Sequence, residues 1–304
     1  MTETGQTAGD GGATPTVGVI GLGAIGDGVA SSVVRAGLPV VVADVRAEAT
    51  DRYRESGTVA GSAAELARLS DVVVVAVVDD DQVRSVLSGP DGALAAARPG
   101  AVVVVVSTIS TSTVAALGAE AAALGVDLVD CGVSGGPSAA ADGELVCMVG
   151  GEREVIDRIA PVLDALGSLT VRMGPLGSGL AAKMARNLVQ YGSWLAAYEG
   201  QVLAEAAGVD LRKLATVIKA SDARIGGAST LMFRTTAAPF TDADDPGLVA
   251  YMRSAAALAH KDLRAALEAG AAAGVTLPLA AMTDARCDDI FGVGSGTASG
   301  TEAS

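Results

Sequence analysis

Short apolar runs rich in Val alternate with helical stretches along the first half of the chain. The apolar runs, which we interpret as strands, are Val17–Ile20, Leu38–Ala43, Asp71–Val78, Ala101–Val106, Val126–Asp130, Glu144–Gly151 and Ser168–Met173. The helical stretches between them are Val29–Ala36, Ala63–Leu69, Asp81–Leu87, Thr113–Leu124 and Val155–Leu166. Strands that are apolar on both faces and separated by helices are typical of a parallel sheet covered on both sides.

The second half of the chain carries only helical patterns. A long stretch without Pro starts at Gly179, and later ones are Leu211–Ala220, Ala228–Phe233, Leu248–Ala269 and Leu279–Phe291. We therefore predict an α/β fold, with a Rossmann-type, mostly parallel sheet in a dinucleotide-binding domain at 16–176. A long interdomain helix joins it to an all-helical substrate and oligomerisation domain at 177–291. Residues 1–15 and 292–304 are expected to form a disordered leader and tail.

The interdomain helix carries two polar side chains on an apolar stretch. Its apolar positions recur at steps of three and four, which predicts one buried face: Leu180, Met184, Leu188, Tyr191, Leu195 and Tyr198. Lys183 and Asn187 lie four residues apart on a neighbouring stripe. Loss of solvation would lower the pKa of Lys183 and let it exchange protons with a substrate, beside an amide that can hold an oxygen. The alternative is a lysine whose ammonium reaches solvent.

Charge and composition narrow the classes of partner. The net charge of −14 argues against nucleic acid and anionic membranes. The single histidine, His260, disfavours a catalytic triad or a multi-His metal site, and we read it as structural. Three widely separated cysteines show no paired metal-ligand spacing. We therefore predict no metal, and a reducing, cytoplasmic location.

A glycine-rich turn follows the first predicted strand and reads Gly21-Leu22-Gly23-Ala24-Ile25-Gly26. A turn of this kind between a strand and a helix is the dinucleotide-binding fingerprint in its required setting. Gly21 makes the tight turn, Gly23 lets the backbone approach the pyrophosphate, and Gly26 lets helix and strand pack closely. The helix N-terminus adds N–H groups and a positive dipole that favour phosphates.

The second predicted strand ends in an acid that bears on the choice of cofactor. Asp44 lies about twenty residues past the turn, where a carboxylate can accept both ribose hydroxyls. Its charge repels a 2′-phosphate, so the sequence favours NAD over NADP, although Arg46 partly offsets this repulsion.

Further candidate residues stand at the carboxyl ends of strands, where such sheets bind ligands. Val77, Val78 and Thr108 occupy two of these ends. After the strand that ends at Asp130, the chain reads Ser134-Gly135-Gly136. Two glycines free consecutive N–H groups for an anion such as a carboxylate; a plain glycine turn is the alternative. Later in the chain, Lys261 and Asp262 are interpreted as an ion pair on the surface. The alternative is that Lys261 reaches the cofactor.

Four motifs in this order resemble the 3-hydroxyisobutyrate dehydrogenase-like branch of the β-hydroxyacid dehydrogenases. They are the Gly21–Gly26 turn, Val133-Ser-Gly-Gly136, Gly177-Ser-Gly-Leu-Ala-Ala-Lys183-Met-Ala-Arg-Asn187 and Lys261-Asp-Leu263. The resemblance covers roughly Val17 to Phe291. The chain departs from the family pattern where Cys131-Gly132 replaces a usual Ala-Pro, where Pro137-Ser138 follows the loop, and where Val78-Asp79 replaces a usual Pro-Thr.

The resemblance implies a role for each matching residue. Lys183 looks like the catalytic acid/base and Asn187 like its substrate-binding companion. Ser134, Gly135 and Gly136 look like the loop that binds the substrate carboxylate. Val77, Val78 and Thr108 match positions near the cofactor, and Lys261 matches the lysine beside the nicotinamide. The expected reaction is hydride transfer between NAD and a small β-hydroxy acid or its semialdehyde, in a homodimer or homotetramer.

Two other functions remain open at this point. One is NADPH-dependent reduction of imines or of glyoxylate-type aldehydes, such as tartronate semialdehyde, on the same fold. Lys183 argues against the imine branch and Asp44 against NADPH. The other is a non-catalytic dinucleotide-binding protein, which would keep the Gly21–Gly26 turn but has no need of Lys183 together with Asn187.

Overall fold

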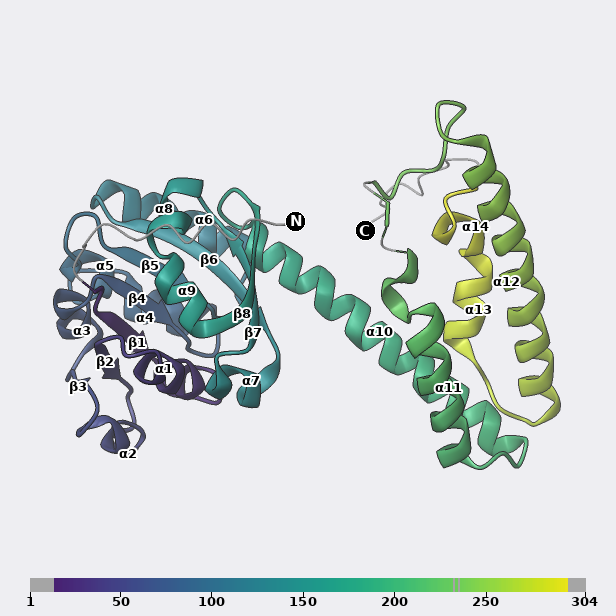
Figure 1. Ribbon diagram of the computed structural model, residues 1–304, viewed down its shortest axis with the longest axis horizontal. Helices are drawn as coiled ribbons and strands as arrows, with labels where there is room; N and C mark the ends of the chain where they lie inside the picture. The colour runs from purple at the N-terminus through teal and green to yellow at the C-terminus, as the bar shows by residue number, and fades with distance from the viewer. Residues whose placement is uncertain (1–13, 232, 235, 295–304) are drawn as a thin grey trace, which may run out of the picture. The chain divides into compact units, whose positions relative to one another are not determined.

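The computed structural model describes residues 14–294, apart from 232 and 235 (Figure 1). The chain divides into two compact units, Met1–Arg186 and Asn187–Ser304. The boundary between them falls inside helix α10 (Ser178–Ala206), the predicted interdomain helix. The predicted leader and tail fall outside the described residues, except for 14–15 and 292–294.

The first unit is built on an eight-stranded sheet in the order β3-β2-β1-β4-β5-β6-β7-β8. All neighbouring strands pair in parallel except β6 and β7, which are antiparallel. The strands are β1 (Val17–Ile20), β2 (Val40–Ala43), β3 (Thr58–Val59), β4 (Val72–Val75), β5 (Val102–Val105), β6 (Asp127–Ser134), β7 (Leu145–Gly150) and β8 (Gly167–Gly174). The predicted mostly parallel, Rossmann-type sheet is confirmed.

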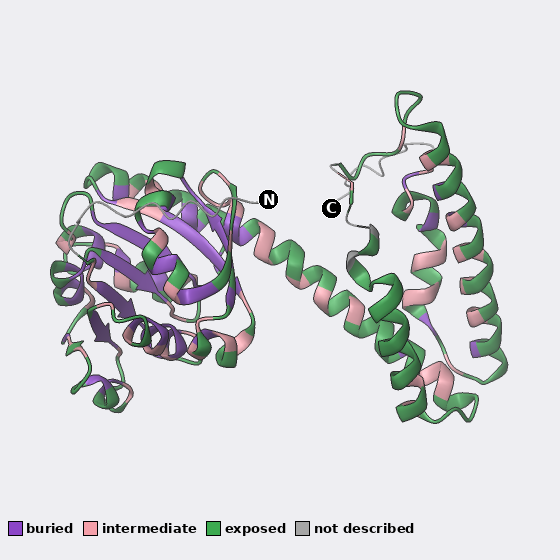
Figure 2. Ribbon diagram, viewed as in Figure 1, coloured by how far each residue is buried: buried purple, intermediate pink, exposed green. Residues whose placement is uncertain are grey.

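Helices cover both faces of this sheet, as the uninterrupted valine runs predict. Within β4, Val72 and Val74 belong to one hydrophobic cluster, whereas Val73 and Val75 belong to another on the opposite face. Figure 2 shows the buried strands between the helices. The helices are α1 (Gly26–Arg35), α2 (Ala47–Thr50), η1 (Asp51–Tyr53), α3 (Ala63–Leu69), α4 (Asp80–Leu87), α5 (Ala93–Ala96), α6 (Thr111–Ala123), α7 (Gly136–Asp142), α8 (Arg153–Arg158) and α9 (Ala160–Leu166).

Some elements of the first unit differ from the sequence expectation. The predicted helix Val155–Leu166 is two helices that meet at Ile159, because Pro161 cannot continue the hydrogen-bond ladder and opens α9 instead. Strand β6 continues to Ser134, and α7 follows at once. The shortest elements, such as β3 and α5, had no hydrophobic period long enough to detect.

The only regular elements among the described residues of the second unit are helices, joined by turns and loops. It comprises the rest of α10 and α11 (Leu211–Ile225), η2 (Ala228–Leu231), α12 (Pro246–Ala272), α13 (Pro278–Ala285) and α14 (Cys287–Ile290). Within this unit, Glu199 of α10 is buried and accepts hydrogen bonds from the N–H groups of Leu279 (2.7 Å) and Ala280 (3.1 Å), which open α13. None of the described helices combines the length and the apolar character needed to cross a membrane.

The predicted buried face of α10 is largely exposed in the single chain. Leu180 is fully buried, but Leu188 is 75%, Tyr191 57% and Tyr198 62% exposed. Most of the α10 ribbon is coloured as exposed in Figure 2. The prediction was therefore wrong for one chain beyond the first turn of the helix. Leu180 packs in the core of the first unit, but the later apolar positions of α10 do not join this chain's own core.

Candidate active site

The glycine turn has the geometry that phosphate binding requires. Gly21 has φ +88°, a conformation that side chains disfavour. A Cβ on Gly26 would lie 1.9 Å from the carbonyl oxygen of Gly21, so only glycine lets α1 begin this close to the turn. A Cβ on Gly23 would meet nothing within 4 Å, so this side of the turn is open. The turn therefore leaves room for a pyrophosphate at the start of α1.

Asp44 is tied to this turn by direct hydrogen bonds. Its Oδ2 accepts from the Leu22 N–H (2.6 Å), and its Oδ1 accepts from the backbone N–H of Arg46 (2.8 Å). The Arg46 guanidinium pairs with the same carboxylate at 3.2 Å and also donates to the Leu22 carbonyl oxygen. Burial acts to raise the pKa of Asp44, but hydrogen bonds from Arg46 and Leu22 outweigh burial and hold that pKa below its ordinary value. Asp44 is thus an anion beside the turn.

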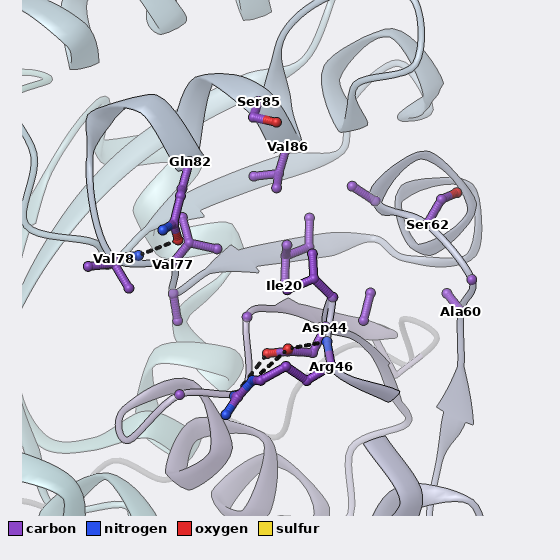
Figure 3. Close-up of a pocket in the computed structure, with 17 residues that line it drawn as sticks. Ile20, Asp44, Arg46, Ala60, Ser62, Val77, Val78, Gln82, Ser85 and Val86 are labelled. Atoms are coloured by element: carbon purple, nitrogen blue, oxygen red, sulfur yellow. Dashed lines mark hydrogen bonds and ion pairs between the residues drawn. The ribbon is translucent and has the colours of Figure 1, made fainter. Parts of the chain in front are cut away.

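A cavity of about 700 Å³ opens between the turn and the ends of β2 and β4 (Figure 3). Asp44 and Arg46 form one wall of it. The opposite wall comes from the segment after β4 and from α4, where Gln82 accepts a hydrogen bond from the Val78 N–H (3.2 Å). This cavity is mainly apolar, with an anion at one edge, as the adenosine half of a dinucleotide needs.

A second cavity, of about 320 Å³, lies at the ends of β4, β5 and β6. Both cavities are lined by Gly23 and by Ala76, Val77 and Val78, so they meet along the turn. The residues that line the second cavity are Gly23, Ala24, Ile25, Ala76, Val77, Val78, Val106, Ser107, Thr108, Val133, Gly136 and Lys183. The predicted strand-end residues Val77, Val78 and Thr108 are thus brought together with Lys183.

Lys183 projects from the start of α10 to the edge of β6. It is half-buried, and its Nζ donates a hydrogen bond to the Val133 carbonyl oxygen. Burial lowers the pKa of Lys183, and the positive charge of Arg186 lowers it further. The lysine therefore faces the cavity with a depressed pKa, and the alternative of an ammonium extended into solvent does not describe it.

The loop predicted to bind a carboxylate has an unusual backbone. Gly135 has φ +133° and Gly136 has φ +77°, values that favour glycine at both positions. Gly136 lines the second cavity, whereas Ser134 and Gly135 do not. Ser134 is the last residue of β6, paired with Val146 of β7, and not part of a free loop.

Two predicted site residues belong to the second unit. Asn187 is half-buried and is its first residue, one helical turn after Lys183 on α10. Lys261 lies on α12, is 70% exposed and pairs with Asp262 at 3.1 Å, as the surface-pair interpretation expects. His260, on the same helix, contacts Asp284 through Nδ1 at 2.5 Å, which fits a structural role.

Sequence reasoning missed one residue close to the site. Asp130, in β6, is fully buried, and its carboxylate accepts hydrogen bonds from the backbone N–H groups of Gly177 (2.6 Å) and Leu180 (2.7 Å). Burial raises the pKa of Asp130, although these N–H groups favour its charged form. The available signal was an acid at the end of the predicted apolar strand, three residues before Val133 of the Val133–Gly136 motif.

This fold and site define an NAD(P)-dependent dehydrogenase with a Rossmann-type domain followed by a helical domain. Residues 16–174 match the NAD binding domain of 6-phosphogluconate dehydrogenase. Residues 177–298 match the NAD-binding region of NADP-dependent 3-hydroxyisobutyrate dehydrogenase. The chain belongs to the β-hydroxyacid dehydrogenase family, which confirms the resemblance inferred from the four motifs.

Individual relatives are similar over most of their length. An uncharacterized oxidoreductase of Mycobacterium tuberculosis is 39% identical, over 88% of this chain and 90% of the relative. The crystal structure of an oxidoreductase from Mycobacterium avium is 36% identical with a TM-score of 0.83, covering 92% of this chain and 99% of that one. The structure of a 3-hydroxyisobutyrate dehydrogenase of Mycobacterium tuberculosis with L-serine is 30% identical with a TM-score of 0.65. The match covers 90% of this chain and 92% of that one.

Proposed function

We propose that this protein oxidises a small β-hydroxy acid of the 3-hydroxyisobutyrate type with NAD, or reduces the corresponding semialdehyde. One observation carries the proposal: Lys183 lines the same cavity as the glycine turn and the ends of β4 and β5. An amine of depressed pKa at the nicotinamide end of a dinucleotide site suits acid–base work on a hydroxyl group. A relative that carries L-serine, itself a β-hydroxy acid, supports the substrate class.

Each residue has a role in the proposed reaction. The Gly21–Gly26 turn and Asp44 would hold NAD, which would supply the hydride acceptor for the carbon that carries the hydroxyl group. Neutral Lys183 accepts the hydroxyl proton, and in the reverse direction its ammonium returns it. The N–H groups of the Ser134–Gly136 segment bind the substrate carboxylate; the family motif suggests this role, and Gly136, which lines the second cavity, supports it. Asn187 binds a substrate oxygen and Lys261 approaches the nicotinamide; both roles rest on the family motifs.

The preference for NAD over NADP is also a proposal. It rests on the Asp44 carboxylate, which is held beside the turn in its charged form by Leu22 and Arg46. A 2′-phosphate would bring a second negative charge to this edge of the cavity. Arg46 cannot fully compensate, because its guanidinium already pairs with Asp44.

The remaining proposals concern where and in what form the protein acts. We expect a homodimer or homotetramer, supported by the exposed apolar side chains of α10. A cytoplasmic location is supported by the three cysteines, which are all free thiols in the structure. We also propose the domain limits 16–176 and 177–291. The start of α10 at Ser178 supports this boundary, whereas the two compact units divide later, after Arg186.

The test is a panel of small hydroxy acids assayed with NAD by absorbance gain. The panel contains 3-hydroxyisobutyrate, 3-hydroxypropionate, glycerate and serine, each also assayed with NADP. We expect Lys183→Ala to lower kcat by about 10² or more while NAD still binds, because only the proton transfer is lost. Near-normal turnover in that variant would remove Lys183 from the mechanism, and cofactor binding without turnover would favour a non-catalytic protein.

A further inference from the structure

Asp130 and Lys183 both form hydrogen bonds that connect strand β6 to the start of α10. Strand β6 provides the Asp130 carboxylate, which accepts from the N–H groups of Gly177 and Leu180 at the start of α10. Three residues later along the same strand, the Val133 carbonyl oxygen accepts from Lys183 Nζ. Lys183 itself stands three residues after Leu180 on α10. The strand therefore fixes both the first turn of the helix and the amine that the helix carries.

The backbones in this region pack without room for side chains. A Cβ on Gly132 would lie 2.6 Å from the Cβ of Lys183 and 2.7 Å from the Gly179 carbonyl oxygen. A Cβ on Gly179 would lie 2.3 Å from the Met148 carbonyl oxygen of β7. The first turn of α10 thus rests directly on β6 and β7. At such distances a shift of this turn moves the Lys183 side chain by a similar amount.

We infer that Asp130 is a positioning residue, whose carboxylate anchors the first turn of α10 on β6 and thereby holds the Lys183 amine at the cavity. Asp130 is fully buried, so its charge needs the N–H groups of this turn as partners. Two short hydrogen bonds to a carboxylate are strong and directional. The effect of Asp130 on catalysis rests on the proposed function of Lys183, whereas the anchoring of α10 by Asp130 does not.

Asp130→Asn tests this role, because an amide keeps the shape of the side chain but accepts with only one of its two atoms. We expect kcat to fall at least about tenfold while the Kd for NAD changes less than about twofold, because the glycine turn and Asp44 are untouched. The matched control is Glu199→Gln, which weakens another buried carboxylate that caps a helix start, about four helical turns after Lys183 on α10. Its kcat should stay within about twofold of the wild-type value.

A second readout does not need turnover. Labelling of Lys183 by acetic anhydride as a function of pH, followed by mass spectrometry, reports the apparent pKa of its amine. Asp130→Asn should raise that pKa toward the ordinary lysine value, since a loosened turn lets the amine gain solvent. Glu199→Gln should leave it unchanged. If wild-type protein oxidises no hydroxy acid, the proposed function fails, yet this labelling still tests the anchoring.

A second variant displaces the carboxylate without changing its charge. A Cβ on Gly150 would lie 2.3 Å from Asp130 Oδ1 and 2.8 Å from both the Gly179 nitrogen and the Pro175 carbonyl oxygen. Gly150→Ala therefore displaces the carboxylate together with the start of α10, and it should reproduce the loss of kcat and the change in labelling. The inference is overturned if a folded Asp130→Asn protein keeps both the kcat and the Lys183 labelling profile of the wild type. It is also overturned if neither variant folds, because Asp130 would then be a stability residue with no separable effect on Lys183.

Discussion

At the scale of single residues, the chemistry of the site depends on two groups whose charge the surroundings control. Asp44 keeps its negative charge because Leu22 and Arg46 donate hydrogen bonds to it. Lys183 is pushed toward its neutral form by burial and by Arg186. The two lie on cavities that share the glycine turn. Each group therefore leads to a separate measurement.

The pH dependence of oxidation should follow the ionisation of Lys183. Because the neutral amine accepts the proton, kcat/KM for hydroxy-acid oxidation should rise with pH and level off above the Lys183 pKa. Since burial lowers that pKa, the inflection should fall below the ordinary lysine value of about 10.4. Reduction needs the ammonium and should show the opposite slope. An oxidation rate that does not change with pH up to that value would contradict this role.

Cofactor choice should respond to the charge of Asp44. Two unit charges about 4 Å apart near a protein surface interact with about 4 kcal/mol. Asp44→Asn removes the repulsion of a 2′-phosphate and releases the Arg46 guanidinium to meet that phosphate. We expect the ratio of kcat/KM with NADP to that with NAD to rise at least about tenfold, which requires only about 1.4 kcal/mol.

The double variant Asp44→Asn, Arg46→Gln provides the control for cofactor choice. It should lose most of the gain with NADP, because no cation then faces the phosphate. An unchanged ratio in Asp44→Asn would mean that the preference is set elsewhere in the larger cavity, for example by the β3–α3 segment around Ser62.

At the scale of elements, the way α10 starts on the sheet decides where its lysine lies. Gly132→Ala would place a methyl group 2.6 Å from the Lys183 Cβ. The helix must then move off β6, so we expect kcat to fall and NAD affinity to change little. Gly192→Ala on the same helix is the control, since its Cβ meets nothing within 4 Å and alanine favours the helix. Equal kcat values in both variants would contradict close packing at Gly132.

The elements that the sequence predicted correctly are those with a long, regular period. The valine runs of β4 and β5 and the helix Ala63–Leu69 were found at or near their observed limits. The glycine turn and Lys183 were recognisable because their residue types are chemically required. Asp130 could not be recognised from the sequence, because its role depends on Gly177 and Leu180, which lie 47 and 50 residues away in the sequence. Only the fold brings these groups together.

At the scale of the whole molecule, the apolar side chains of α10 need a second surface. Leu188, Tyr191, Trp194 and Tyr198 are each more than half exposed, although their spacing is that of a buried helix face. Large exposed apolar patches mark interaction sites. A second copy of this chain would offer the same helix, and two-fold symmetric pairs bury the same patch on both partners. Burial between two copies would therefore account for the buried face that the sequence predicted.

Trp194 makes this association directly measurable. It is the single tryptophan of the chain and is 59% exposed in the isolated chain. On association its emission should shift to shorter wavelength, and the mass from light scattering should be a multiple of 29.8 kDa. Leu188→Glu places a charge in the patch, so it should shift the protein to monomers and its emission to longer wavelength. Val45→Glu, at a fully exposed side chain in the first unit, should change neither quantity. A wild-type monomer at all concentrations would contradict the assembly and leave the exposed face of α10 to another partner.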